Sequence, residues 1–179
     1  MNVNISDGCV VSSSHDWDHV YSCINTKKLK KNKLLTTIPE LGKEWEVSMQ
    51  IKLTKYYTSS FHNIFHMTVG GGAHYGERTP GIWIDDSKQL YISSAVNGDN
   101  GYHYKADSIP LNKYRIVKVQ QTLTDGGKYM FAIFIDRKKV FNVVNTQPEA
   151  FKDVKVFASN EGDVSQAGSI KEIIIKTQK

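Results

Sequence analysis

Long hydrophobic runs are missing from this sequence of 179 residues, and so is any sustained amphipathic helical pattern. No apolar stretch approaches the ~18 residues that a membrane-spanning helix needs, so we expect no transmembrane segment. The first residues, MNVNISDGCVVSSS, lack the basic start and the apolar stretch of a signal peptide, which we expect to be absent or already removed. With 40% hydrophobic and 23% charged residues, the composition is that of one globular domain.

Cysteine is scarce, with Cys9 and Cys23 as its only two occurrences. Two cysteines are too few for a zinc site, and their separation is not that of a Cys-x-x-Cys redox motif. The pair favours a disulfide that closes an N-terminal loop, which would indicate an oxidising compartment. Asn4, in Asn-Ile-Ser, is a potential N-glycosylation acceptor and points the same way. The alternative is two unpaired thiols.

Phosphate-binding motifs are also absent, although Gly70, Gly71 and Gly72 follow one another. A phosphate loop needs a Lys-Ser/Thr pair entering a helix after its glycines. Here the glycines are followed by AHYGERTPGIW, in which Pro80 and β-branched residues argue against a helix. The stretch therefore predicts a long rim loop between two strands rather than a nucleotide site.

A pair of catalytic carboxylates is not evident either. Retaining glucanases place three acids on one strand face, in a Glu-x-Asp-x-x-Glu pattern, and two of them act as nucleophile and acid/base. The nearest string is EGDVSQ, with Glu161 and Asp163 but with Gln166 in place of the third acid. The sequence therefore does not indicate an enzyme, and an atypical glycosidase is kept only as an alternative.

Two histidine pairs have a spacing of four residues. On a helix, His15 and His19 would share a face and could chelate a divalent ion, but no helical pattern supports them. His62 and His66 lie in an expected strand, where they would be ~13 Å apart. Ordinary polar side chains are the favoured interpretation of both pairs, with a metal at the first pair as the alternative.

Alternation with a period of two is the dominant pattern. Residues 45–53, WEVSMQIKL, place apolar side chains at every odd position, which is typical of a half-buried antiparallel strand. Residues 129–135, YMFAIFI, are apolar on both faces and predict a strand buried on both sides. Turn sequences occur at 97–101, 124–128 and 135–139. Further strands are expected at 9–13, 61–69, 81–85, 89–96, 114–123, 138–144, 154–159 and 170–176.

These short strands and turns predict an all-β jelly-roll sandwich of two antiparallel sheets. Residues 1–33 differ in composition and are expected to form an N-terminal arm, which holds both cysteines. Residues 34–179 are expected to form the sandwich, and the whole chain one compact domain.

The net charge of +5 is concentrated in one short segment. Five lysines, Lys27, Lys28, Lys30, Lys31 and Lys33, equal the whole net charge, so the rest of the chain is neutral. Such a cationic patch could hold sulfated glycan, anionic lipid headgroups or nucleic acid. The alternative is a solvated linker that keeps the protein soluble.

Two loops have the composition of a sugar-binding rim. Aromatic side chains beside amides and carboxylates suit a sugar, because the rings contact its C–H face and the polar groups bind its hydroxyls. The alternative is that these aromatic residues only cover a hairpin. The expected ligand-binding residues, in loops 70–81 and 97–104, are His74, Tyr75, Asn97, Asp99, Asn100, Tyr102, His103 and Tyr104.

Residues 34–176 resemble a laminin-G-like domain of the concanavalin-A-like lectin/glucanase superfamily. The resemblance rests on PGIWIDDSKQLYISSAVNGDNGYHY, on LNKY before a long strand, and on FASN with GSIKEI near the end. It is similar to versions in extracellular proteins of simple animals such as cnidarians. The resemblance implies a jelly roll that binds glycans or proteins, often heparin.

Many such domains hold calcium at the rim of the sandwich, and the matching acids here are Glu77 and Asp163. No cofactor is required by the resemblance, and calcium is the one that it allows. Glu77 departs from the usual aspartate.

These observations together predict a secreted or extracellular module that recognises glycans, anionic or sulfated ones included, without catalysis. No nucleic-acid partner is expected. The first alternative is a protein-protein adhesion or receptor-ligand module, which would contact its partner through a sheet face. The second is a glycoside hydrolase with atypical acids.

Overall fold

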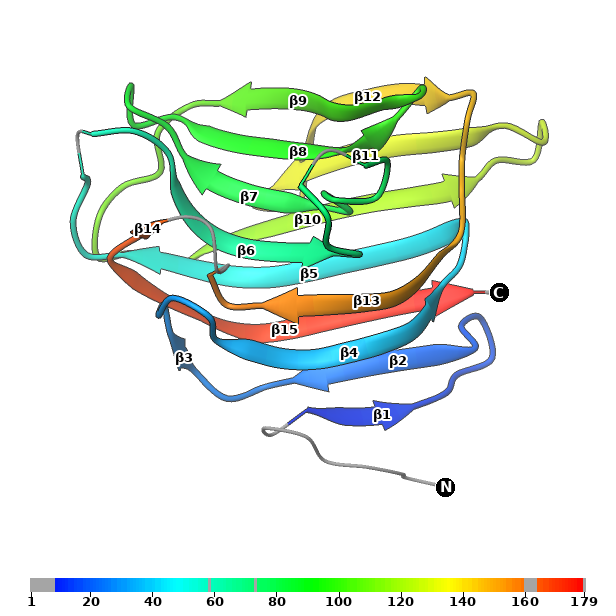
Figure 1. The fold of residues 1–179 in the computed structure, drawn as a ribbon, viewed down its shortest axis with the longest axis horizontal. Coiled ribbons are helices and arrows are strands. Elements are labelled where there is room, and N and C mark those ends of the chain that lie inside the picture. The colour runs from blue at the N-terminus through cyan, green and yellow to red at the C-terminus, as the bar shows by residue number, and fades with distance from the viewer. Residues whose placement is uncertain (1–8, 58, 73, 160–163, 179) are drawn as a thin grey trace.

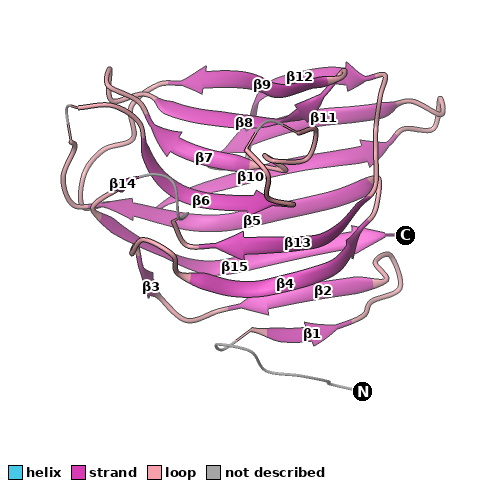
Figure 2. Cartoon of the chain, viewed as in Figure 1, coloured by secondary structure: helices cyan, strands magenta, loops and turns pink. Residues whose placement is uncertain are grey.

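The computed structural model describes residues 9–57, 59–72, 74–159 and 164–178, and within them all regular secondary structure is β-strand (Figures 1 and 2). Among these residues there is no helix that could cross a membrane. The predicted all-β sandwich is confirmed. Its strands are β1 (Val10–Ser12), β2 (His19–Cys23), β3 (Lys27–Lys28), β4 (Leu34–Leu41), β5 (Glu44–Leu53), β6 (His62–Thr68), β7 (Gly81–Ile84), β8 (Leu90–Val96), β9 (Asp99–Ala106), β10 (Arg115–Leu123), β11 (Tyr129–Ile135), β12 (Lys138–Asn145), β13 (Phe151–Phe157), β14 (Val164–Ser165) and β15 (Gly168–Gln178).

The strands form two sheets that lie one behind the other in Figure 1. The eight-stranded sheet has the order β1-β2-β15-β5-β10-β11-β12, with β3 also paired to β15. The seven-stranded sheet has the order β4-β13-β6-β7-β8-β9, with β14 paired to β6. Every pairing is antiparallel except the short one between β14 and β6.

Strand β5 shows how the sequence determines the sandwich. Its odd positions, from Trp45 to Leu53, are buried in the core, and its even positions, from Glu44 to Lys52, are half-buried on the outer face. Each large apolar side chain removed from water stabilises the fold by roughly 1.5–3 kcal/mol. The period of two therefore fixes which face of the sheet meets the other sheet.

Strand β11 corrects one expectation. Its residues were predicted to be buried on both faces, and Phe131 and Ile133 are indeed buried in the core. On the other face Met130 and Phe134 are only half-buried, because none of the described strands forms a second layer on this side of the eight-stranded sheet. Lysine side chains cover Phe134 instead, since apolar stems and ammonium groups can shield an aromatic ring.

The N-terminal segment supplies three strands of the eight-stranded sheet. Strand β2 pairs with β15 from Cys23 opposite Ile173 to His19 opposite Thr177. The predicted disulfide between Cys9 and Cys23 is confirmed, and both cysteines are buried in the core. Asn4 lies outside the described residues.

The predicted turns are confirmed as well. Strands β8 and β9 are joined through Asn97 and Gly98, with φ angles of 55° and 76°. Strands β11 and β12 are joined through Asp136 and Arg137, with φ angles of 49° and 69°. The three glycines 70–72 lie in the loop from β6 to β7 and all have positive φ, which glycine adopts without steric cost.

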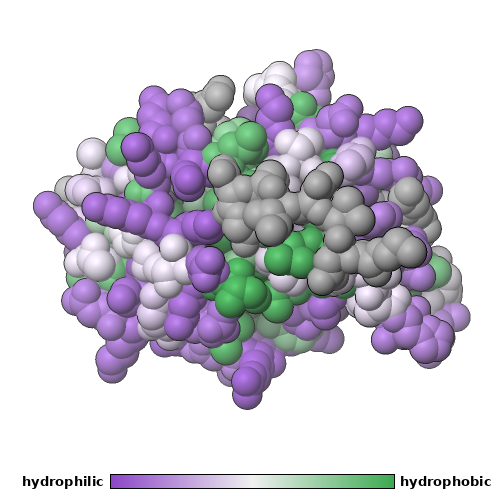
Figure 3. Space-filling model, turned by 90° about the horizontal axis from the view of Figure 1, so that it is seen from below, coloured by the Kyte–Doolittle hydropathy of each residue, from purple (hydrophilic) through white to green (hydrophobic). Residues whose placement is uncertain are grey.

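One edge of the sandwich, where β1, β2 and β4 lie, is mainly hydrophilic with a hydrophobic patch near its centre (Figure 3). Three exposed apolar side chains, Val10, Ile24 and Leu34, belong to this part of the chain. Strand β4 is at the opposite end of the seven-stranded sheet from β8 and β9. The patch is therefore remote from the aromatic surface described next.

Candidate functional site

Aromatic side chains gather on the outer face of the seven-stranded sheet, where β6, β7, β8 and β9 lie side by side (Figure 1). Trp83 on β7 is opposite Tyr91 on β8, and their ring centroids are 6.1 Å apart. Tyr91 also contacts Phe61, edge to face at 5.0 Å, and His103 of β9, stacked at 4.7 Å. These rings point outward because their strand neighbours, such as Ile82 and Ile92, point into the core.

The indole of Trp83 lies across the backbone of its own strand. A Cβ atom added at Gly81 would lie 2.0 Å from Cη2 of Trp83, so this position admits only glycine while the indole keeps its place. The ring of His66 contacts the indole edge-on, with the centroids 5.1 Å apart. Trp83 is therefore held from both sides, and only 4% of it is exposed.

A pocket of about 340 Å³ opens beside these rings. This volume is at the lower end of the range for small-molecule sites. We call it the Trp83 pocket, and it is lined by Ser60, Phe61, Arg78, Trp83 and Tyr91.

Arg78 provides the cationic group of the Trp83 pocket. Its Cζ is 5.4 Å from the centroid of the Trp83 ring, and its Nε is 3.8 Å from Oε2 of Glu77. Within the described part of the chain its buried Nε has no hydrogen-bond partner. A guanidinium carries five N–H donors in a planar fork, so Arg78 has donor capacity to offer to a ligand.

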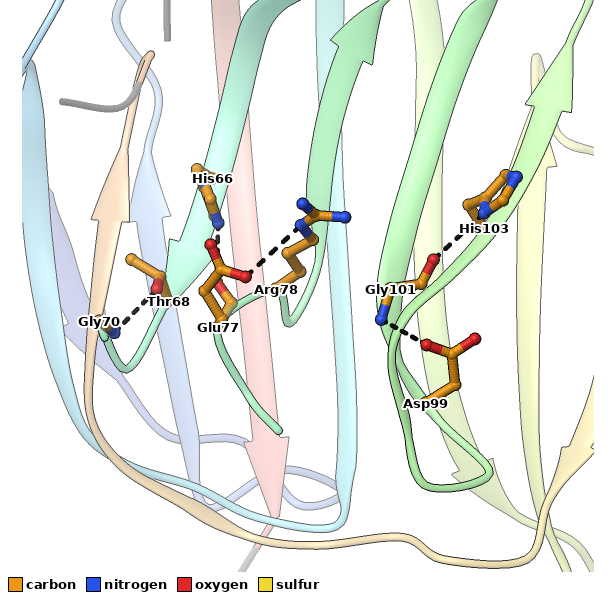
Figure 4. Close-up of polar contacts among 8 residues, drawn as sticks. All are labelled: His66, Thr68, Gly70, Glu77, Arg78, Asp99, Gly101 and His103. Atoms are coloured by element: carbon orange, nitrogen blue, oxygen red, sulfur yellow. Dashed lines mark hydrogen bonds and ion pairs between the residues drawn. The ribbon is translucent and has the colours of Figure 1, made fainter. Parts of the chain in front are cut away.

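Two hydrogen bonds hold the loop that carries Arg78. Nε2 of His66 donates to the backbone carbonyl of Glu77 at 2.7 Å, and the N–H of Ala95 donates to the carbonyl of Arg78 at 2.9 Å. Figure 4 shows His66 directed at Glu77, and Arg78 between Glu77 and Gly101. The guanidinium is close to β9, because a Cβ atom at Gly101 would lie 3.5 Å from its Nη1.

An ion pair stabilises the same face beyond Tyr91. Asp85 is fully buried, and its carboxylate accepts hydrogen bonds from the backbone N–H groups of Ser87 and Gln89 and contacts Nζ of Lys105 at 2.9 Å. Burial alone would raise the pKa of Asp85, but the contacts with Lys105, Gln89 and Ser87 outweigh it, and the pKa is lowered. Lys105 also lies over the Tyr91 ring, 5.9 Å from its centroid.

The first predicted rim residues have structural contacts. The hydroxyl of Tyr75 donates to the carbonyl of Gln147 at 2.8 Å, and its ring packs on Phe151 at 5.9 Å. The amide oxygen of Asn97 accepts hydrogen bonds from the backbone N–H and the hydroxyl of Thr146. His74 is exposed in the loop between β6 and β7. Tyr75 and Asn97 therefore fix these loops to the segment after β12.

The residues predicted on β9 divide between its two faces. Tyr102 and Tyr104 point inward and pack on Phe141 at 6.2 and 5.0 Å, whereas His103 points outward and stacks on Tyr91. Asp99 accepts a hydrogen bond from the N–H of Gly101 at 2.8 Å, and Asn100 is half-buried next to it. Of the predicted β9 residues, the structure brings His103 into ring contact with the aromatic cluster beside the pocket.

The five lysines of the predicted cluster lie on a short strand and in the turn that follows it. Lys27 and Lys28 form β3, which pairs with β15, and the other three lie in the turn before β4. Lys30 and Lys31 are exposed, while Lys33 is half-buried. On β3 successive side chains alternate between the two faces, so only Lys28 occupies an outward position on the eight-stranded sheet.

A calcium ion does not fit Glu77 alone. The carboxylate of Glu77 faces the guanidinium of Arg78, and a cation there would compete with that ion pair. Asp163, the second acid of the expected site, lies outside the described residues, as does Glu161. Across the described ranges no three His, Cys, Asp or Glu side chains are grouped so that they could hold a metal.

The four histidines at spacings of four have separate surroundings. His19 lies on β2, where it stacks on Tyr21 at 6.4 Å, and His15 lies in the loop before β2. His62 stacks on Tyr57 at 4.9 Å, while His66 supports Trp83. Each pair is therefore split between different contacts.

Sequence reasoning missed the residues that line the Trp83 pocket. The sequence GIWID predicts a strand, and its three consecutive apolar residues also indicate that one of them must lie on the outer face. Ile82 and Ile84 take the core face, which leaves Trp83 as a large aromatic ring on the outer face. Arg78 has no such signal, because its place beside Trp83 depends on the path of an irregular loop.

No family model matches this sequence, and no curated protein matches it. Solved structures do match. A Trypanosoma rangeli sialidase in complex with 2,3-difluorosialic acid has a TM-score of 0.58 at 7% identity, and covers 98% of this chain. The chain spans only 29% of that enzyme's length.

Two further structures are similar over most of the chain. The CBM40 of a Ruminococcus gnavus sialidase, bound to α2,3-sialyllactose, has a TM-score of 0.53 at 11% identity and covers 85% of this chain and 90% of its own. A heptameric pentraxin from Limulus polyphemus has a TM-score of 0.53 at 11% identity and covers 79% of this chain and 67% of its own. At these identities the likeness shows the fold alone, a sandwich of two antiparallel sheets.

Proposed function

We propose that this chain is a non-catalytic glycan-binding module whose ligand occupies the Trp83 pocket. One observation carries the proposal: a pocket lined by the rings of Phe61, Trp83 and Tyr91 is also lined by Arg78, whose guanidinium lies beside the Trp83 ring. A pocket with aromatic walls and one group of N–H donors is a candidate ligand site.

The chemistry of the pocket suits a sugar ring. The C–H face of a sugar packs on aromatic rings, here the 40%-exposed Phe61, whose ring is held edge to face against Tyr91. The hydroxyls or a carboxylate of the same sugar would accept hydrogen bonds from Arg78. Because a guanidinium binds a carboxylate or sulfate through two parallel hydrogen bonds, acidic sugars should bind more tightly than neutral ones.

The lining of the pocket argues against hydrolysis. Glycoside hydrolysis generally needs two carboxyl groups that flank the bond to be cleaved. None of the described lining residues is acidic, and the nearby Glu77 is paired with Arg78. We therefore propose binding without catalysis.

Two observations support an extracellular setting and glycan recognition. Disulfides persist in oxidising compartments, and Cys9 and Cys23 are paired. The structural neighbours include a module bound to sialyllactose, which is consistent with glycan recognition by a fold of this kind.

A binding titration tests this function. The chain is screened against immobilised neutral and acidic glycans, and the best ligand is titrated by calorimetry against the unaltered protein, Tyr91→Ala and Arg78→Gln. We expect each substitution to weaken binding at least tenfold, about 1.4 kcal/mol. Tyr129→Ala is the matched control, because Tyr129 is a half-buried strand tyrosine on the other sheet and should leave affinity unchanged.

Equal affinity for all three variants, with unfolding transitions intact, would reject the Trp83 pocket. A protein that binds no glycan but forms a stable complex with another extracellular protein would support the adhesion alternative instead. Release of reducing ends from any oligosaccharide would contradict the non-catalytic part.

A further inference from the structure

The outer face of the eight-stranded sheet carries a row of lysines that the sequence does not place together. By strand register and alternation, six lysines occupy outward positions on β3, β5, β10, β12 and β15. We call this surface the lysine face. Its lysines are Lys28, Lys52, Lys118, Lys139, Lys171 and Lys176.

Two of these lysines lie over one tyrosine, and a third is their neighbour in the strand register. Ser169 of β15 lies between Lys28 of β3 and Lys52 of β5 in the register, and Lys171 is two residues further along β15. Nζ of Lys52 and Nζ of Lys171 lie 4.9 and 4.3 Å from the centroid of the Tyr114 ring. Positive charge is thus concentrated where β3, β15 and β5 meet.

The other three lysines lie around Glu46 and Phe134. Nζ of Lys118 and Nζ of Lys176 both contact the carboxylate of Glu46, at 3.3 and 3.1 Å. Lys118 and Lys139 lie over the Phe134 ring, 4.4 and 5.7 Å from its centroid. One carboxylate is shared by two ammonium groups, so this group also retains positive charge.

The charge balance of the face is positive. The same surface also carries three negatively charged residues, at outward positions of the described strands or in the bulge of β15. They are Glu44, Glu46 and Glu172. Three net positive charges therefore lie on this surface, out of a formal net charge of +5 for the whole chain. Because β3 to β12 span six adjacent strands, the face is roughly 24 Å across.

We propose that the lysine face binds an acidic polysaccharide, independently of the Trp83 pocket. A polyanionic chain can cross several strands and meet the lysines in succession, as charge complementarity requires. The proposal adds a second ligand surface to the proposed function and does not depend on the first.

Nucleic acid fits this face less well. Single-stranded nucleic acid stacks its bases on open aromatic rings, but Tyr114 and Phe134 are each covered by two ammonium groups. The disulfide also suits an oxidising compartment, where acidic polysaccharides rather than nucleic acids would be met. Both points favour the polysaccharide.

Retention and affinity measurements test the proposal with the whole chain. The probes are heparin as a sulfated chain and polygalacturonate as a carboxylated one, and a quadruple variant replaces Lys52, Lys118, Lys139 and Lys171 by Gln. We expect at least a tenfold loss of affinity for the preferred probe at 0.15 M salt. Its log–log salt dependence should also become shallower, because fewer counterions are released.

A second quadruple variant is matched in charge. It replaces Lys30, Lys31, Lys88 and Lys155, which are exposed and outside the lysine face, by Gln. This variant should keep most of its affinity, and an equal loss in both variants would overturn the proposal. The first quadruple variant should keep its affinity for the small glycan that binds the Trp83 pocket, because none of its four lysines lines that pocket. Failure of the lysine face and failure of the Trp83 pocket are therefore distinguishable.

Two competitors complete the test. Single-stranded DNA and vesicles containing an anionic phospholipid are measured at the same salt concentration. Tighter binding of either one than of both polysaccharides would overturn the proposal in favour of a nucleic-acid or membrane surface. Weaker binding of both competitors supports it.

Discussion

The outer faces of the two sheets both combine aromatic rings with cations, but they do so in different ways. On the lysine face each of two rings, Tyr114 and Phe134, is covered by two ammonium groups. On the seven-stranded sheet, Arg78 lies beside Trp83 and Lys105 lies over Tyr91, but the same rings also line a pocket. The two faces therefore differ in what they offer a ligand: a broad positive surface on one, and a pocket with aromatic walls on the other.

This difference between the two faces follows from how lysine and arginine side chains are held. Lysine has a flexible stem that lies along the sheet and covers whatever ring is near it. Arg78 is held by its loop through the hydrogen bonds of His66 and Ala95, so its planar group cannot spread over the whole aromatic cluster. Arg78 therefore lies at the wall of the pocket, whereas strand lysines on both sheets, Lys105 included, lie over neighbouring rings.

Gly81→Ala should have the largest effect of the substitutions considered, and it should affect the aromatic face alone. The added Cβ would lie 2.0 Å from Cη2 of Trp83, so the indole must leave its place on β7. We expect a loss of about 3 kcal/mol in the free energy of unfolding, as for overpacked core sites. Glycan binding at the Trp83 pocket should fall at least 30-fold, while heparin retention on the lysine face stays unchanged. Chemical denaturation measures the free energy of unfolding, and the two binding assays measure glycan affinity and heparin retention.

The matched glycine control is Gly126→Ala, in the turn between β10 and β11. A Cβ there would lie 3.9 Å from the nearest side-chain atom, an ordinary contact. Its stability and its glycan affinity should both remain close to those of the unaltered protein. If both glycine variants behaved alike, the role assigned to the Trp83–Gly81 contact would be wrong.

Removal of the disulfide should lower the stability of the protein without changing glycan binding on the other sheet. Replacing Cys9 and Cys23 by Ala opens a loop whose closure is worth up to ~3 kcal/mol of stability. Because this loop belongs to the eight-stranded sheet, glycan affinity at the Trp83 pocket should not change. Thermal unfolding of the double variant measures its stability, and calorimetry measures its glycan affinity. A loss of affinity together with the loss of stability would show that the two sheets are coupled.

Asp85→Asn should weaken the aromatic face through its buried ion pair. The folded-state pKa of Asp85 lies below its usual value of 3.8, so the charged carboxylate stabilises the fold above that value. This contribution is lost as the pH falls through the folded-state pKa. We expect a loss of about 2 kcal/mol at pH 7, as for hydrogen bonds to a buried charge.

The pH dependence provides the control for Asp85→Asn. The difference in unfolding free energy between the variant and the unaltered protein should shrink as the pH is lowered below 4. Denaturant titrations at several pH values measure it. A difference that stayed constant with pH would mean that the amide perturbs packing rather than charge.

Alternation made most of the fold predictable. The bounds of β11 match the predicted 129–135, and β5, β10 and β15 also follow apolar patterns. Strand β4 was missed, because Pro39 and two threonines interrupt its pattern. Strand β9 was missed because it begins within the glycine-rich turn and lies at the edge of its sheet, with polar residues outward.

The candidate sites were less predictable than the strands. The period of two already groups Tyr102 and Tyr104 with Ala106, which is buried, so their inward direction could have been read from the sequence. The lysine face could not, because its members come from five strands whose order follows from tertiary pairing. Local clustering drew attention to Lys27–Lys33 instead, although only Lys28 of these residues joins that face.

The smallest predicted effect concerns the phenol of Tyr114, which reports the potential of the lysine face. A hydrogen bond with Ser169 lowers the pKa of Tyr114, and burial opposes this shift. The positive charges of Lys52 and Lys171 lower the pKa further. Replacing both lysines by Gln should therefore raise this pKa towards its usual value of 10.0. The titration is followed by ultraviolet difference spectroscopy, with Tyr114→Phe identifying the signal among the nine tyrosines. An unchanged titration would show that the two ammonium groups lie too far from the ring to create a local positive potential, and the lysine face would then lose its strongest group.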